Sequence, residues 1–194
     1  NLPPYNITFT PSSGTELTTS DITTAISNYG GFAEARYFFI QLETQYQYMH
    51  YAEIEIYDEA GNNIALTGTA KQSSLIDPPS NAVDGDITNP HHTTNSNHEW
   101  LGIDLSSNGI TNQKIAGIRV YGRVDSTMVP GGVHYARTTP FRIFLYKDSD
   151  YTNSNFQDGY SYGPLDYNNY QLHSSDATRA PVTGTQQVFY YGIT

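Results

Sequence analysis

Short stretches of alternating apolar and polar residues recur along the chain, and this period of two is typical of β-strands with one buried face. The clearest stretches are 36–42, 51–57, 100–105, 118–123, 141–146 and 186–193. In the second of them, Ile54 and Ile56 point inward. Glu53 and Glu55 then point outward. The number of such strands, and the scarcity of helical patterns between them, predict an all-β protein.

One short helix is expected before the first strand. The apolar residues of 22–29 recur at the i, i+3, i+4 and i+7 positions of a helix, and either Ser20 or Asp21 can cap its N-terminus. A helix of about two turns is marginal alone, so it must pack against something larger. We therefore divide the chain into an N-terminal arm with a short helix, over 1–33, and one β domain over 34–194.

A polar loop rich in His, Thr and Asn precedes the strand at 100–105. Asp84 and Gly85 form a turn within this loop, and the prolines at positions 78, 79 and 90 keep it extended and non-helical. The next strand, 118–123, turns its arginines away from its apolar residues. Strand, loop and strand together make a rigid frame on which a binding site can be presented.

Five motifs follow one another through this frame: A-K-Q-S-S, A-V-D-G, the His/Thr loop, W-L-G-I-D-L and R-V-D. In this order they resemble the discoidin or coagulation-factor C-type domain family, most closely its fucolectin (F-type lectin) branch. Each motif alone is weak, but all five in register are a specific signal. The resemblance implies a jelly-roll-like antiparallel β-sandwich of the galactose-binding-domain type.

The order of the strands departs from that family. The stretches A-R-Y-F-F-I and A-E-I-E-I-Y, within 34–57, resemble the last two strands of a discoidin-type domain, yet here they precede the motifs of its beginning. Two explanations remain open. These strands are either the tail of a preceding domain or part of a circularly permuted one. We favour permutation, because two orphan strands would expose apolar edges.

Oxygen-bearing side chains surround the Asp84-Gly85 turn, and oxygen is the ligand that calcium prefers. Fucolectin-like domains typically bind Ca²⁺ in this loop. By position, the resemblance implies as ligands the carboxylates of Asp84 and Glu53, the carbonyls of Ala52, Asn81 and Asp86, and the hydroxyl and carbonyl of Thr94 (Thr93 if the alignment slips by one). The alternative is that Asp84 only opens an Asx-type turn in a solvated loop.

The resemblance also implies a sugar site built from one histidine and two basic residues, which donate to sugar oxygens. His98 is the first choice for the histidine and His92 the second. Arg123 and Asp125 match the family's R-x-D motif. The second basic residue is missing at its usual place, and Arg137 can substitute only if the following loop folds back.

Composition narrows the classes of partner. The formal net charge is −10, which argues against nucleic acid and fits cations or neutral ligands. Because the chain has no cysteine, disulfides and thiolate metal sites are excluded. The histidines of the polar loop lack the spacing of a zinc site. No apolar run approaches the roughly 20 residues that cross a bilayer, so membrane insertion is not expected.

We therefore expect a non-catalytic, calcium-dependent carbohydrate-binding (lectin-like) module, because no catalytic motif is evident. Its partners would be glycans or glycoproteins, at an extracellular or otherwise exposed surface. The alternative is a structural or adhesion domain of an extracellular or virion surface assembly, acting through protein–protein contacts or self-association. Asp84, the His/Thr loop and Arg123 favour the first. The missing second basic residue and the lack of cysteines favour the second.

Overall fold

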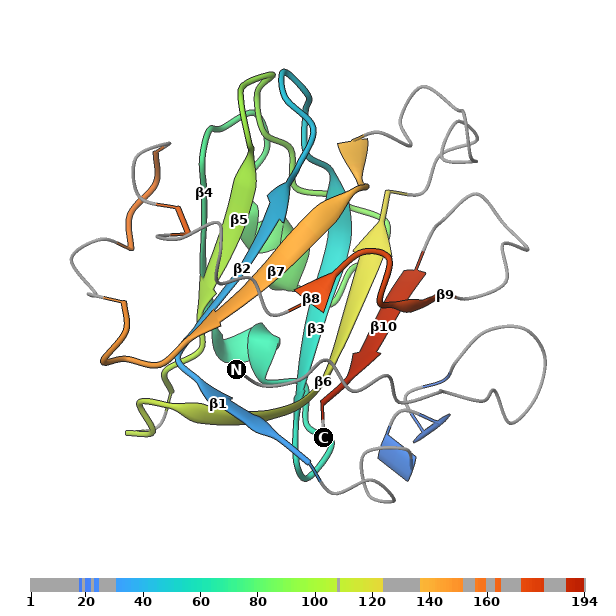
Figure 1. Cartoon of the computed structure of the whole chain (residues 1–194), viewed down its shortest axis with the longest axis vertical. Coiled ribbons are helices and arrows are strands. Elements are labelled where there is room, and N and C mark those ends of the chain that lie inside the picture. The colour runs from blue at the N-terminus through green and yellow to red at the C-terminus, as the bar shows by residue number, and fades with distance from the viewer. Residues whose placement is uncertain are drawn as a thin grey trace.

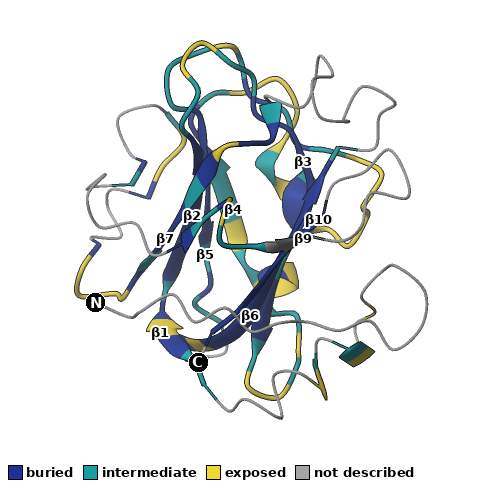
Figure 2. Cartoon of the chain, turned by 45° about the vertical axis from the view of Figure 1, so that its right-hand side comes forward, coloured by how far each residue is buried: buried dark blue, intermediate teal, exposed yellow. Residues whose placement is uncertain are grey.

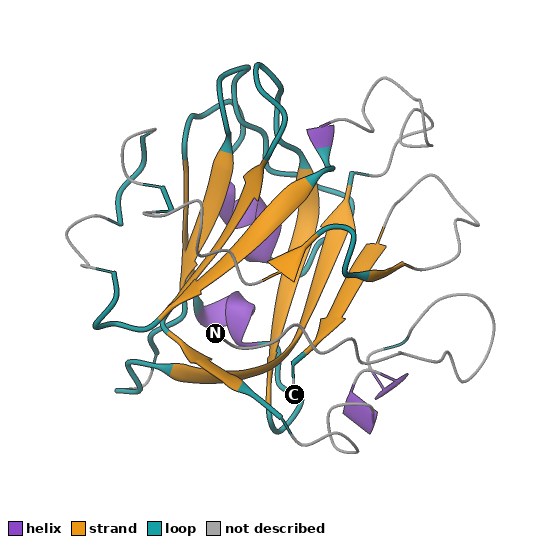
Figure 3. Ribbon diagram, viewed as in Figure 1, coloured by secondary structure: helices purple, strands orange, loops and turns teal. Residues whose placement is uncertain are grey.

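The protein is described by a computed structural model at residues 18, 20–21, 23–24, 31–107, 109–123, 137–151, 156–159, 163–164, 172–179 and 188–193. Two antiparallel sheets face each other (Figures 1 and 3). The first sheet has the order β4(Thr69–Gln72), β5(Trp100–Asp104), β2(Tyr37–Leu42), β7(Phe141–Tyr146) and β8(Leu172–His173). The predicted all-β sandwich is confirmed, and its jelly-roll connectivity stays a prediction.

The second sheet is organised around its long strand, β6(Gln113–Gly122). Three strands pair with β6, namely β1(Ala33–Ala35), β3(Tyr51–Asp58) and β10(Val188–Gly192). The short β9(Thr178–Arg179) pairs with β10. Two 3₁₀ helices complete the described elements, η1(Ile64–Thr67) and η2(Pro79–Val83).

The strands of 34–57 belong to this sandwich. β2 lies between β5 and β7 and pairs with both, and β3 pairs along β6. An orphan tail of another domain would leave these edges unpaired, so that explanation is wrong. The integration of both strands is what a permuted domain requires. That the chain is a permuted discoidin-type domain stays a prediction.

The core between the sheets follows the predicted alternation. Leu101, Ile103 and Leu105 of the β5 stretch join the central apolar cluster, as do Ile54 and Ile56 of β3. The inward faces of the strands form the dark interior of Figure 2. Each such side chain contributes about 1.5–3 kcal/mol when it is fully buried.

The outer face of the β2–β5–β7 sheet is covered by a second, aromatic layer. Its members are Tyr37, Phe39, Trp100, Phe144, Tyr146, Tyr151 and Phe156. β2 is therefore buried on both faces, and all six of its residues are buried. Two members of this layer, Tyr151 and Phe156, come from the chain after β7, and both are buried.

The start of the N-terminal helix is only partly described. Ser20, Asp21, Thr23 and Thr24 have helical conformation, and the apolar residues predicted for its face lie outside the described residues. The Asp21 amide donates to Thr18 Oγ1, and the Thr18 amide donates to Asp21 Oδ2. This reciprocal pair makes Thr18 the N-cap, so the predicted caps are wrong by two or three residues. No helix among the described residues is long and apolar enough to span a membrane.

We expect Asp104→Asn to lower the free energy of unfolding by about 1–3 kcal/mol. Arg36, which directly precedes β2, donates to both carboxylate oxygens of Asp104, at 3.0 and 2.8 Å. An amide cannot accept both bonds, and the guanidinium is largely buried. Urea unfolding measures the loss. A variant as stable as wild type would show that this pair contributes nothing.

Candidate functional site

The polar loop and the start of β3 are joined at one end of the sandwich, where the β2–β3 and β4–β5 connections meet at the top of Figure 1. The His91 amide donates to the Tyr51 carbonyl at 3.0 Å, and the Thr93 amide donates to the Met49 carbonyl at 3.2 Å. Gln47 and Ser96 form a further bridge. The polar loop is thus hydrogen-bonded along 47–51, and these bonds fix its backbone at this end of the sandwich.

The Q-S-S motif explains how the loop is anchored. Gln72 Nε2 donates to the carbonyls of Asp77 and His92, and Gln72 Oε1 lies 2.9 Å from His91 Nδ1. The two serines that follow both donate to the buried carboxylate of Glu99. Ser74 Oγ also accepts from the Thr94 amide at 2.9 Å. These bonds give the motif a structural role that its sequence alone did not reveal.

Glu53 is the central residue of the predicted calcium site. Its carboxylate is fully buried, although the strand pattern placed it on the outward face. The Gly85 amide donates to Oε2 at 3.2 Å, and Oε1 has no hydrogen-bond partner among the described residues. Burial raises the pKa of Glu53 to about 8; the hydrogen bond from the Gly85 amide opposes this shift, and the nearby Asp84 carboxylate adds to it. The structure therefore brings together the two carboxylates that the resemblance assigned to one metal.

Ala52, the residue before Glu53, interrupts the ladder between β3 and β6. Tyr51 pairs with Gly122 and Glu53 with Tyr121, so Ala52 is the extra residue of a β-bulge. Bulges re-aim the backbone next to functional sites. This placement fits the predicted use of the Ala52 carbonyl as a metal ligand.

The turn opposite Glu53 begins where η2 ends. Asn81 lies within η2, Asp84 caps its C-terminus, and Gly85 has a φ of +84°, which favours glycine. Asp84 Oδ1 accepts from the Asp86 amide at 2.8 Å, so the alternative prediction of an Asx turn is also met. The Thr88 hydroxyl and amide donate to Asp86 and lower its pKa. Asp86 therefore uses its side chain within the loop, and its carbonyl, the predicted ligand, accepts from the Asn89 amide at 3.3 Å.

The Thr94 carbonyl, a predicted metal ligand, already accepts a hydrogen bond within the loop. It accepts from Thr93 Oγ1 at 3.1 Å, and Thr93 Oγ1 itself accepts from the Met49 amide. Among the described residues, no group of three His, Asp or Glu side chains is arranged so that it could hold a metal ion. The available donors are therefore two carboxylates and several backbone carbonyls, a set that suits calcium, which takes six to eight oxygens.

Beside this turn the structure assembles a group of basic and aromatic side chains, which we call the basic rim: Tyr48, His50, His92, Arg123 and Arg137. Arg123 Nη1 lies 3.4 Å from His50 Nδ1, and the His50 and His92 ring centroids are 3.8 Å apart. The Arg137 guanidinium carbon lies 4.7 Å from the centre of the Tyr48 ring. Three predicted ligand residues are thus brought together, and Arg137 does return to the site.

Backbone contacts fix Arg137 beside β3. The His50 amide donates to the Arg137 carbonyl at 3.0 Å, and Thr138 Oγ1 donates to the His50 carbonyl. The Tyr51 hydroxyl donates to the Thr138 carbonyl at 2.8 Å. The segment before β7 therefore runs along the start of β3, which is the fold-back that the sequence left undecided.

The histidines of the basic rim are held neutral. Burial, and to a smaller extent the neighbouring His92, Arg123 and Arg137, lower the pKa of His50 to about 2. Burial also lowers the pKa of His92, while Asp77, 3.5 Å away, opposes that shift. Near neutral pH both rings can donate through one nitrogen and accept through the other.

Two members of the basic rim, Tyr48 and His50, were not predicted. Their only signal was their place on the same stretch as Ala52 and Glu53, two to five residues earlier. His98, the first choice from the sequence, has a φ of 54° and accepts from Gln41 Nε2 through its carbonyl. Its role stays a prediction. Asp125 lies outside the described residues.

His91, next to His92, has a structural role instead. It is fully buried, and its ring stacks on Tyr51 with centroids 5.8 Å apart. Burial lowers its pKa to about 3. The neighbouring histidines of this loop therefore point to different partners, as expected from their spacing.

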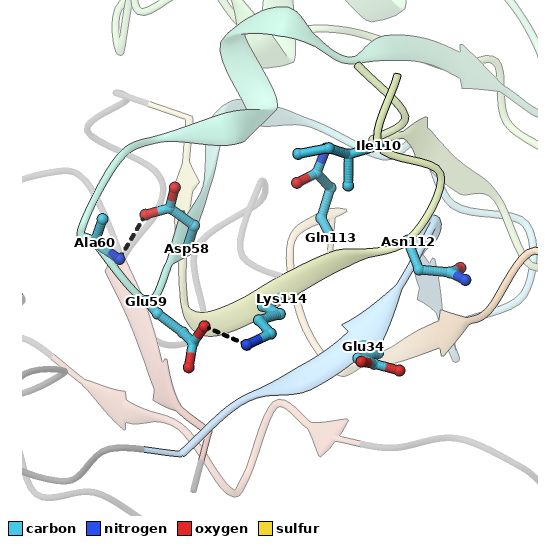
Figure 4. Close-up of a pocket in the computed structure, with 8 residues that line it drawn as sticks. All are labelled: Glu34, Asp58, Glu59, Ala60, Ile110, Asn112, Gln113 and Lys114. Atoms are coloured by element: carbon cyan, nitrogen blue, oxygen red, sulfur yellow. Dashed lines mark hydrogen bonds and ion pairs between the residues drawn. The ribbon is translucent and has the colours of Figure 1, made fainter. Parts of the chain in front are cut away.

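An open groove of about 360 Å³ lies at the other end of β6, lined in part by Glu34, Asp58 and Glu59 (Figure 4). Lys147 pairs with Glu34 at 3.0 Å and Lys114 pairs with Glu59 at 2.9 Å. Asp58 accepts from the Ala60 amide. β6 separates this groove from the basic rim by about 30 Å along the strand. Its acids are already paired, and no predicted site residue lines it.

Comparison with known protein families, with curated proteins and with solved structures yields no match to this chain.

Proposed function

We propose that the protein is a non-catalytic, calcium-dependent carbohydrate-binding module of the fucolectin-like type. One observation supports the proposal: a single short stretch, at the start of β3 and just before it, contributes to both the basic rim and the predicted metal site. His50 belongs to the basic rim, and Glu53, three residues later, accepts from the Gly85 amide, with Ala52 as the bulged residue just before it. A metal that fixes this run would also fix the rim beside it.

Calcium would be held by Asp84 and Glu53, with carbonyls of Ala52, Asn81 and Asp86. The orphaned Oε1 of Glu53 supports this fit, since a buried carboxylate oxygen needs a partner. When bound, the ion would neutralise two adjacent carboxylates. The loop that contains the Asp84-Gly85 turn continues to His92 of the basic rim. The His92 carbonyl accepts from the Ile76 and Asp77 amides, which hold this part of the loop in place. The position of the rim is thereby tied to the metal turn.

The basic rim has the chemistry of a saccharide site. Guanidinium groups donate to hydroxyl and ring oxygens, and an aromatic face such as that of Tyr48 packs against sugar C–H groups. Leu75 and Ile76, beside His92, are exposed and extend the apolar surface. The lowered pKa of His50 removes it from acid–base catalysis near neutral pH, which supports binding without reaction.

We expect the protein to bind a subset of glycans on an array in the presence of Ca²⁺, and to lose this binding in excess chelator. Arg123→Ala should lower the affinity at least about tenfold, because a donor to the sugar is removed. Arg142→Ala is the matched control, since Arg142 lies on β7, outside the rim, and pairs with Glu43. Unchanged binding by Arg123→Ala, or by the chelated protein, would contradict the proposal.

The exposed Leu75 and Ile76 also favour the second candidate, an adhesion domain that acts through protein contacts. On that proposal, calcium and the rim are incidental, and the apolar pair is the contact. Leu75→Ser would then reduce self-association in sedimentation experiments. On the lectin proposal it would weaken glycan binding and leave the sedimentation unchanged. For either function, we propose that the protein acts at an extracellular or otherwise exposed surface, such as that of a virion.

A further inference from the structure

Arg137 of the basic rim differs from other arginines of this acidic protein in its lack of a carboxylate partner among the described residues. Arg36 pairs with Asp104 and Asp148, Arg119 pairs with Glu55, and Arg142 pairs with Glu43. Arg137 has no ion pair among the described residues and lies over the Tyr48 ring instead. In a chain of net charge −10, a guanidinium left without a carboxylate is available for a ligand's charge.

The residues around Arg137 carry charges of both signs. Arg123 Nη1 lies 3.4 Å from His50 Nδ1, and His50 is fully buried. Asp77 is half exposed and lies 3.5 Å from His92. Among the described residues no carboxylate pairs with Arg137, so its charge is available to a ligand.

The orientation of Arg137 suits an oxyanion. A guanidinium stacked on an aromatic ring keeps its planar edge free to form two parallel hydrogen bonds. Carboxylates and sulfate esters match that fork, whereas a hydroxyl group accepts only through single, uncharged bonds. The charge and the geometry of the rim therefore select the same class of ligand.

Building on the proposed lectin function, we infer that the saccharide bound by the basic rim is acidic, carrying a carboxylate or sulfate ester that pairs with Arg137. The sugar hydroxyls face His92, and the apolar sugar face meets Tyr48. The net charge of the whole chain favours a neutral or cationic ligand, but Arg137, which has no ion pair among the described residues, favours an anionic group at this site.

The test is a calcium-loaded array of matched pairs: galactose beside galacturonate, galactose beside galactose 6-sulfate, and glucose beside glucuronate. We expect the acidic member to bind at least about tenfold more tightly than its neutral partner, with a preference that falls as salt rises. Arg137→Gln should reduce the preference to near one, because it weakens binding of the acidic member much more than binding of its neutral partner. Arg142→Gln is the control for loss of an arginine elsewhere.

The outcomes separate the two proposals. Equal binding of acidic and neutral partners, or a preference that survives Arg137→Gln, overturns the acidic-ligand inference and leaves the lectin proposal standing. Absence of binding to every saccharide overturns both. Inorganic sulfate that competes as well as the sulfated sugar would show an anion site without saccharide recognition, and this also overturns the inference. If Arg137→Gln unfolds, Arg137→Lys keeps the charge and tests the fork alone.

Discussion

Replacing Glu53 by glutamine is expected to stabilise the calcium-free protein at pH 8.5 and to abolish its stabilisation by calcium. The Glu53 carboxyl has a pKa raised to about 8 by burial, against an ordinary value of 4.5. Its contribution to stability is therefore complete below about pH 4.5 and is lost as the pH rises to about 8. Glutamine mimics the neutral acid at every pH.

The expected gain for Glu53→Gln in chelator is on the order of a few kcal/mol at pH 8.5, and it should vanish near pH 4.5. With Ca²⁺ at 100 times its dissociation constant, wild type should gain about 2.7 kcal/mol and the variant nothing. Thermal unfolding at both pH values measures these effects. Glu59→Gln is the control, because Glu59 is an exposed acid paired with Lys114.

Two results would contradict this account. A Glu53→Gln protein less stable than wild type in chelator at pH 8.5 would show that the carboxylate is not strained by burial. Equal stabilisation of both proteins by calcium would show that the ion binds elsewhere. The sign of the change in unfolding free energy distinguishes two roles for Glu53. Loss of an ordinary hydrogen bond lowers stability both in chelator and in Ca²⁺. Loss of a buried metal ligand raises stability in chelator and lowers the stabilisation by Ca²⁺.

The strands were predictable from sequence because their pattern is set by local chemistry. Leu101, Ile103 and Leu105 must face one side of any strand that contains them, and the structure buries all three in the core. The turn at Gly85 was equally visible. What the pattern could not give was the burial of β2 on both faces, because that depends on Tyr151 and Phe156, more than a hundred residues away.

The site was predictable only where a motif marked it. Asp84 and Glu53 were placed together by resemblance, and the structure joins them through the Gly85 amide. His50 was missed because nothing in its neighbourhood signals a ligand. Its role arises from contacts with Arg123 and His92, which lie 73 and 42 residues further along the chain. Convergence of this kind is a property of the tertiary fold.

Phe39→Ala is expected to lower the free energy of unfolding by about 3–5 kcal/mol, or roughly 10 °C in melting temperature. The ring is fully buried in the aromatic layer, with its centroid 5.6 Å from Trp100 and 5.1 Å from Tyr151. Its partner in the sheet is Gly102, where a Cβ would lie 2.6 Å from the ring. Gly102 therefore leaves a space that the Phe39 ring fills together with the ring of Phe156.

Tyr46→Ala is the control for this substitution, because Tyr46 is an aromatic residue that is 67% exposed, and its loss should change stability by no more than about 0.5 kcal/mol. If Phe39→Ala were as mild as the control, the layer would be loosely packed and its tyrosines open to a ligand. If the loss is large and glycan binding by the folded variant is unchanged, the aromatic layer is a second core. The glycan then binds at the basic rim, at the end of the sandwich where β3 begins and where Glu53 lies.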